Sequence, residues 1–131
     1  MKGSTTSHVL YQDENFIAIL DKYPIAMGHT LVMPKKHFER VNDLTILEFG
    51  ALHARVYALN RVITCRLNAS ASHISINDGA AANQLIPHVH VHIIPRNVGD
   101  TAGFTARKLV PLEEMEKIRE KLQIRDLEIT V

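Results

Sequence analysis

Residues 88–96 read His-Val-His-Val-His-Ile-Ile-Pro-Arg, so that three histidines alternate with apolar β-branched residues. Successive side chains of a β-strand point to opposite faces. The stretch therefore predicts a strand that Pro95 ends, with His88, His90 and His92 on one face and an apolar row on the other. Histidine is the side chain whose unperturbed pKa lies closest to neutrality, at about 6.5. A row of imidazoles opposite an apolar row indicates a reactive surface.

Further short apolar runs precede the histidine strand, and they predict the rest of a sheet. The first two flank a short polar group, which is the pattern of a β-hairpin. The third is followed by Pro34, which should end it. The expected strands before the histidine run are residues 9–11, 16–20, 29–33 and 72–76.

Two helices are predicted. Thr45 and Glu48 have the spacing of a capping box. Apolar residues then recur every three or four positions, as on a buried helical stripe, to a helix end near Asn68. A second, charged helix is expected from Pro111 to about Ile124.

Strands in hairpin order around one long helix favour an α+β fold: an antiparallel sheet of about five strands, one long helix and a C-terminal helix. No repeat or linker divides the sequence, so we expect residues 1–131 to form a single domain. Residues 97–110 have no clear period and are expected to be loop. In the mainly helical tail 111–131, residues 126–131 allow one short last strand.

The composition excludes several classes of function. A net charge of +1 gives no field for nucleic acid or an anionic membrane. The single cysteine, Cys65, excludes an internal disulfide and a Cys-x-x-Cys metal motif. Residues 1–7 are polar and hold no apolar signal core, and no stretch is apolar enough to span a membrane. We therefore expect a cytoplasmic protein that binds neither nucleic acid nor a membrane.

Two kinds of chemistry fit the histidine row. Residues two apart in a strand lie about 6.6–6.8 Å apart, so three imidazoles from one strand would strain to reach one ion at about 2.0–2.1 Å. A metal-dependent hydrolase is thus the weaker alternative. A neutral imidazole is instead a good nucleophile, and His90 has a histidine on each side to orient it and to handle the substrate. His37, after Pro34 and two lysines, is expected on the surface.

The run from His88 resembles the signature of the histidine triad family of nucleotidyl hydrolases and transferases, His-φ-His-φ-His-φ-φ with φ apolar. Asn77-Asp78-Gly79 with Gln84 is similar to the phosphate-side loop of that family. Residues 28–35 are similar to its Gly-His-x-φ-φ-x-Pro segment. Asp21 occupies the position at which many members have an Asp or Asn that binds the ribose hydroxyls. The resemblance covers about residues 8–96. A histidine at position 92, where the uridylyltransferase branch has Gln, points to the hydrolase branches.

The resemblance implies a reaction. His90 would attack the α-phosphorus of a purine nucleotide conjugate and form a covalent nucleotidyl-histidine, from which water releases a nucleoside monophosphate. The conjugate would be a nucleoside phosphoramidate or a dinucleoside polyphosphate. The implied catalytic residues are His88, His90 and His92, and the implied nucleotide- and phosphate-binding residues are Asp21, His29, Asn77 and Gln84. The resemblance implies a homodimer, and neither a metal nor a cofactor.

Two loop positions depart from the family pattern. Many members have Gly before the glutamine and Ser or Thr after it, where this chain has Asn83 and Leu85. Asparagine tolerates a left-handed backbone, so Asn83 is expected to preserve the shape of the loop. Leu85 removes a hydroxyl that could donate to the phosphate or to the departing group. The alternative function is therefore a nucleotide-binding regulatory protein with weak or vestigial catalysis.

Overall fold

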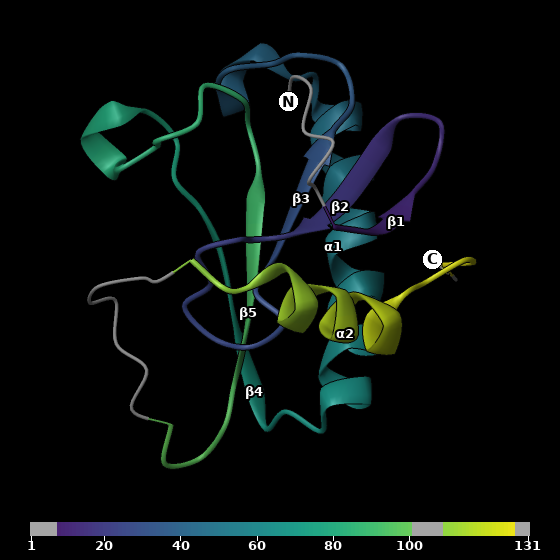
Figure 1. Cartoon of the computed structure of the whole chain (residues 1–131). Helices are drawn as coiled ribbons and strands as arrows, with labels where there is room; N and C mark the ends of the chain where they lie inside the picture. Colours follow the sequence, from purple (N-terminus) through teal and green to yellow (C-terminus); the bar gives the residue numbers. More distant parts are fainter. Residues whose placement is uncertain (1–7, 101–108, 128–131) are drawn as a thin grey trace.

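The computed structural model describes residues 8–100 and 109–127 (Figure 1). Within them five strands form one sheet in the order β1-β2-β3-β5-β4, and every neighbouring pair is antiparallel. The strands are β1 (Val9–Gln12), β2 (Phe16–Leu20), β3 (Thr30–Pro34), β4 (Ala71–Ile76) and β5 (Val91–Arg96). The predicted α+β class and the predicted sheet are confirmed. The prediction of a single domain over residues 1–131 stays a prediction.

The long helix has the predicted ends. Helix α1 spans Ile46–Leu67. At its start the Thr45 hydroxyl accepts the Glu48 N–H at 3.1 Å and the Glu48 carboxylate accepts the Thr45 N–H at 2.8 Å. It ends at Asn68, which has a left-handed φ of 52°. The remaining helical elements are η1 (Val41–Asp43), η2 (Ala80–Ala82) and α2 (Leu112–Leu122).

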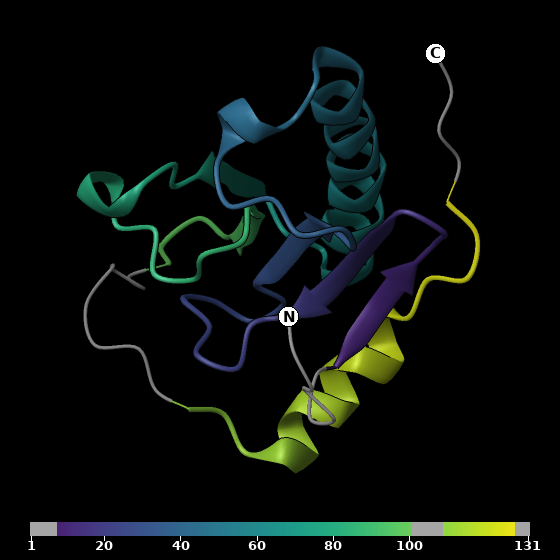
Figure 2. The ribbon, with the colours of Figure 1, turned by 90° about the horizontal axis from the view of Figure 1, so that it is seen from above.

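The main core lies between α1 and one face of the sheet, and α2 lies beside β1 (Figure 2). Apolar side chains of β2, β3 and β5 meet the predicted stripe of α1 there, and Met115 and Leu122 of α2 join them. A smaller apolar cluster, Ile19, Leu31 and Met33, faces the other way. His92 pairs with Leu31, and directly opposite residues share a face, so the histidine row lies on the side of the sheet away from α1.

The histidine strand differs from the prediction at both ends. It begins at Val91, so His88 and His90 lie in the segment just before it, with His88 in a bend. The Val89 N–H bonds to the Phe38 carbonyl at 2.6 Å instead of joining the ladder. At the other end Pro95 does not stop the strand. Pairing with β3 ends at Ile93, and a proline is tolerated where a strand has lost one of its neighbours.

The predicted C-terminal helix is present, whereas the described start of the expected last strand is not a strand. Pro111 is the N-cap of α2, whose buried residues are Met115 and Leu122. Residues 126 and 127 are not in a strand. Residues 128–131, where the rest of the short last strand was expected, and residues 101–108 of the expected loop lie outside the described residues. Among the described residues, no helix is long and apolar enough to cross a membrane.

Candidate active site

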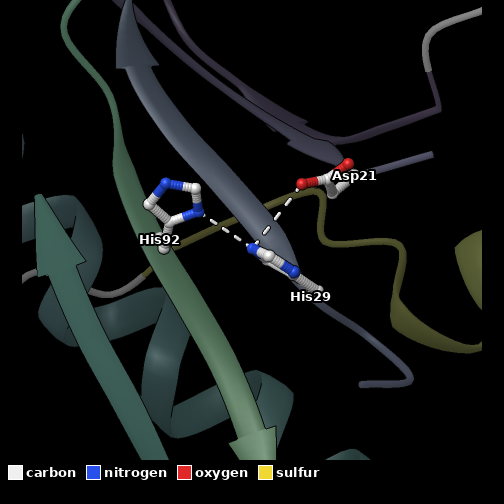
Figure 3. A group of neighbouring side chains, drawn as sticks. All are labelled: Asp21, His29 and His92. Atoms are coloured by element: carbon white, nitrogen blue, oxygen red, sulfur yellow. Dashed lines mark hydrogen bonds and ion pairs between the residues drawn. The ribbon is translucent and has the colours of Figure 1, made fainter. Parts of the chain in front are cut away.

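Three neighbouring strands bring Asp21, His29 and His92 together (Figure 3). Asp21 follows the end of β2, His29 precedes the start of β3, and His92 lies in β5. The Asp21 N–H donates to the His29 carbonyl at 2.9 Å, which continues the β2–β3 ladder by one more bond. The register of the sheet therefore determines which polar side chains meet.

The contacts of His29 determine where its hydrogen lies. The Ile25 N–H donates to Nδ1 of His29 at 3.0 Å, so a neutral His29 carries its hydrogen on Nε2. This Nε2 lies 2.9 Å from Nδ1 of His92 and 3.7 Å from a carboxylate oxygen of Asp21. His92 therefore accepts at Nδ1, and a neutral His92 carries its own hydrogen on Nε2. His29 is fully buried, which shields its two hydrogen bonds from bulk solvent.

The same three residues could be taken for a metal site, because their ligand atoms lie within 4.8 Å of one another. A histidine that binds a metal usually donates its other ring N–H to an acceptor. Here Nδ1 of His29 faces the N–H of Ile25, which is a donor. If Nε2 of His29 bound a metal, its hydrogen would lie on Nδ1, and this N–H would point at the N–H of Ile25. The arrangement fits a hydrogen-bond relay and does not fit a metal centre.

His90 has the opposite tautomer from His92. Its Nδ1–H donates to the His88 carbonyl at 2.7 Å, so a neutral His90 has a lone pair on Nε2. The rings of His90 and His92 meet edge to face with centroids 4.9 Å apart. His90 is only 5% exposed. A lone pair and an N–H donor are thus presented by neighbouring rings.

His88 is buried and held from two sides. Its Nε2–H donates to the Pro34 carbonyl at 2.7 Å, and its Nδ1 lies 3.3 Å from Nδ1 of His37. Burial lowers the pKa of His88, and the hydrogen bond to Pro34 only partly opposes this effect. His88 is therefore neutral at neutral pH. His37 is exposed as expected, but sequence reasoning missed its contact with His88, because nothing in the spacing of positions 37 and 88 indicates it.

The loop after β4 is tied to the start of η1. Asp78 accepts the N–H of Val41 and the Nε–H of Arg40, both at 2.9 Å. The bond from Val41, followed by that from Arg40, lowers the pKa of Asp78. Gly79 has φ +99°, and a Cβ there would lie 2.8 Å from Cζ of Arg40. The positive φ is what favours glycine at this position, because the exposed guanidinium of Arg40 is the end of a flexible side chain.

Gln84 holds this loop together with its own amide. Its Oε1 accepts the Gly79 N–H at 2.7 Å, and its Nε2 donates to the carbonyls of Glu39 (2.6 Å) and Ile86 (3.1 Å). Asn83 has φ 66°, which confirms the expected left-handed conformation. Leu85 is 84% exposed. A phosphate contact of Gln84 stays a prediction, and its observed bonds are to backbone atoms of the loop and of Glu39.

The predicted residues fall into two adjoining groups. Asp21, His29 and His92 meet through their side chains, and the ring of His90 contacts His92, whereas His88 lies at the other end of β3 beside Pro34. Asn77 follows directly on Ile76, which pairs with Val91, so it lies beside His90. Its Nδ2 donates to the Asn83 carbonyl at 3.4 Å. The roles of these residues in binding and catalysis stay predictions.

The chain is similar to known proteins of one family. The HIT domain family matches residues 2–99. A bis(5'-nucleosyl)-tetraphosphatase (asymmetrical) of Schizosaccharomyces pombe is 42% identical over 111 residues, which are 85% of this chain and 59% of that protein. A bis(5'-adenosyl)-triphosphatase of Dictyostelium discoideum is 34% identical over 122 residues, 93% of this chain and 79% of that protein. The crystal structure of a hypothetical histidine triad nucleotide-binding protein of Sulfolobus tokodaii superposes with a TM-score of 0.82 at 37% identity, over 89% of this chain and 81% of that one.

Proposed function

The chain belongs to the HIT domain family, and on that premise we propose that it is a nucleotidyl hydrolase that releases a nucleoside monophosphate from a purine nucleotide conjugate. One observation carries the proposal: His90 has its lone pair on Nε2 while the adjacent His92 has its hydrogen there. A nucleophile next to a donor is what displacement at phosphorus requires.

The reaction proceeds in two displacements. Nε2 of His90 attacks the α-phosphorus, a P–N bond forms, and the bond to the leaving group breaks with its electron pair going to the leaving atom. The positive charge that develops on the His90 ring is stabilised by its Nδ1–H bond to the His88 carbonyl. Water then attacks the same phosphorus, the P–N electron pair returns to Nε2 of His90, and the water proton passes to solvent.

The tautomer of His92 favours one class of leaving group. A neutral imidazole N–H is a good hydrogen-bond donor but a very weak acid. A departing polyphosphate needs only the hydrogen bond, whereas a departing amine needs a whole proton. The relay from His29 keeps His92 in this donor form. We therefore assign the dinucleoside polyphosphates as the preferred substrates, ahead of the phosphoramidates.

The remaining residues surround the nucleotide. Asp21 receives the ribose hydroxyls, and Asn77 and the backbone of the loop after it face the phosphates. The cluster Ile19, Leu31 and Met33 lies on the histidine side of the sheet and offers an apolar wall for the purine. Within this scheme Gln84 acts by holding the loop.

We also propose a homodimer that forms at β4. Among the described elements β4 is an edge of the sheet, and its Ile74 is 48% exposed. At the opposite edge the Leu10 carbonyl of β1 already accepts the Ile124 N–H. An uncovered edge with an exposed apolar residue favours pairing with a second copy. Sedimentation should show a dimer that Ile74→Lys dissociates, and a monomeric parent protein would contradict the proposal.

The reaction is tested on chelator-treated protein mixed with diadenosine tetraphosphate and quenched within milliseconds. We expect AMP release and, by intact mass, an adenylyl adduct; His90→Ala should abolish both while nucleotide still binds. His53→Ala is the control, because His53 lies on α1, on the other side of the sheet from the histidine row. Binding without turnover by the parent protein would favour the regulatory alternative. Turnover that returns only with added metal would favour the metal-dependent one.

A further inference from the structure

His37 and Phe38 hold the chain that leads into β5. Nδ1 of His37 lies 3.3 Å from Nδ1 of His88, and the two ring centroids are 5.4 Å apart. The next residue, Phe38, accepts the Val89 N–H through its carbonyl. Two consecutive residues after β3 therefore contact two consecutive residues just before His90, one through a side chain and one through the backbone.

The donor in the contact between the two rings can be identified. The Pro34 carbonyl can only accept, so the hydrogen in its bond to His88 lies on Nε2 of His88. A neutral His88 then has a lone pair on Nδ1, and the hydrogen in the 3.3 Å contact must come from His37. His37 provides this Nδ1–H both as the Nδ1 tautomer of the neutral ring and as the imidazolium.

We propose that His37 is a positioning residue, which donates to Nδ1 of His88 and thereby keeps His88 neutral and holds the carbonyl that orients His90. The consequence for catalysis rests on the proposed function, but the hydrogen bond can be tested without any substrate. Among the described residues, the titratable groups that face His88 are His37 and His90. A proton on His88 would place a positive charge beside His90 and weaken it as a nucleophile.

The test compares His37→Asn with His37→Leu, two side chains of similar size. Nδ2 of asparagine can occupy the place of Nδ1 and donate, whereas leucine cannot donate. In protein labelled with ¹⁵N-histidine, long-range ¹H–¹⁵N spectra report the tautomer and the titration of His88. We expect the Asn variant to match the parent protein. In the Leu variant the midpoint of the His88 titration should rise by about 0.5–1 pH unit, the size expected for one hydrogen bond.

A kinetic measurement links this contact to the reaction. In the pH profile of kcat, the fall in rate at low pH should begin at a higher pH in the Leu variant than in the parent protein. The Asn variant should keep the parent profile, and KM should be unchanged in both variants. Equal His88 titrations in the two variants would overturn the proposal, whether or not the protein turns over nucleotides. Because position 37 is exposed, both variants should fold; if the Leu variant does not, His37→Ala is predicted to show the same rise, and an unchanged midpoint there would overturn the proposal equally.

Discussion

The Nδ1–H of His90 donates to the backbone carbonyl of His88, two residues earlier in the chain, over 2.7 Å. Because the acceptor is a backbone atom, the tautomer of His90 depends on the path of the chain and not on a further side chain. That path is held by the bond of Val89 to Phe38 and by the bond of the His88 ring to Pro34. The position of the segment before β5 therefore determines which nitrogen of His90 can act as a nucleophile.

The role of His92 as a donor can be separated from a role as an acid. Nε2 of a glutamine can take the place of Nε2 of His92 and donate a hydrogen bond, but it cannot give up a proton. With diadenosine tetraphosphate, His92→Ala should lose about 10²–10³ in kcat, the loss typical of one such donor. His92→Gln should recover most of this loss. If Gln is as inactive as Ala on this substrate, His92 acts as an acid.

The ribose contact of Asp21 is tested with substrate analogues. One carboxylate oxygen of Asp21 accepts the Tyr23 N–H at 2.8 Å, a bond that Asn can keep through its own carbonyl oxygen. Asp21→Asn weakens the acceptor for ribose hydroxyls, so KM for the ribonucleotide substrate should rise by about tenfold or more. KM for the 2',3'-dideoxy analogue should not change. An equal rise for both substrates would place the effect in the relay through His29.

Much of this site follows from local pattern. The contact between the rings of His90 and His92, the capping box at Thr45 and the left-handed Asn83 each depend on residues close in sequence, and each is observed. The contact of His37 with His88 joins positions 51 apart. It exists only because β3 and β5 are neighbours, which no periodicity shows. The start of β5 differs from the prediction for a similar reason, because the Val89 N–H bonds to Phe38, which is not in a strand.

The turn between β1 and β2 should make stability depend on pH. Asp13 accepts the N–H groups of Asn15 and Phe16, both at 2.9 Å, the hydroxyl of Tyr11 at 2.6 Å and the Nε–H of Arg55 at 3.0 Å. Burial favours a raised pKa for Asp13, but these bonds outweigh it and lower the pKa below the ordinary 3.8. Asp13→Asn should therefore cost about 1–3 kcal/mol in urea unfolding at pH 7.

The sign of the pH dependence follows from the direction of that shift. A carboxylate whose pKa is lowered in the folded state stabilises the protein fully above its unfolded value of 3.8. This contribution is lost as the pH falls below that value. The gap between the parent protein and Asp13→Asn should hence narrow on going from pH 7 to pH 3. A gap that stays constant would mean that the carboxylate charge contributes nothing.

The last prediction concerns Leu85, the position where the family pattern has a hydroxyl. Leu85 is 84% exposed and follows Gln84, whose amide holds the loop. A substitution there should change the free energy of unfolding by less than about 0.5 kcal/mol, so its effect on rate can be interpreted directly. We expect Leu85→Ser to raise the turnover of adenosine phosphoramidates by about tenfold or more, part of the 10²–10³ that one positioned donor can provide. Leu85→Ala is the matched control.

The physical reason lies in the leaving group. An amine must take up a proton to depart, and the neutral His92 is a poor source of one because His29 already donates to its Nδ1. A serine hydroxyl at position 85 could pass a proton onward, whereas a departing polyphosphate has no such need. The gain should thus be confined to phosphoramidates. An equal gain with diadenosine tetraphosphate would mean that the hydroxyl stabilises the phosphate itself, and no gain with either substrate would remove Leu85 as the cause of slow phosphoramidate turnover.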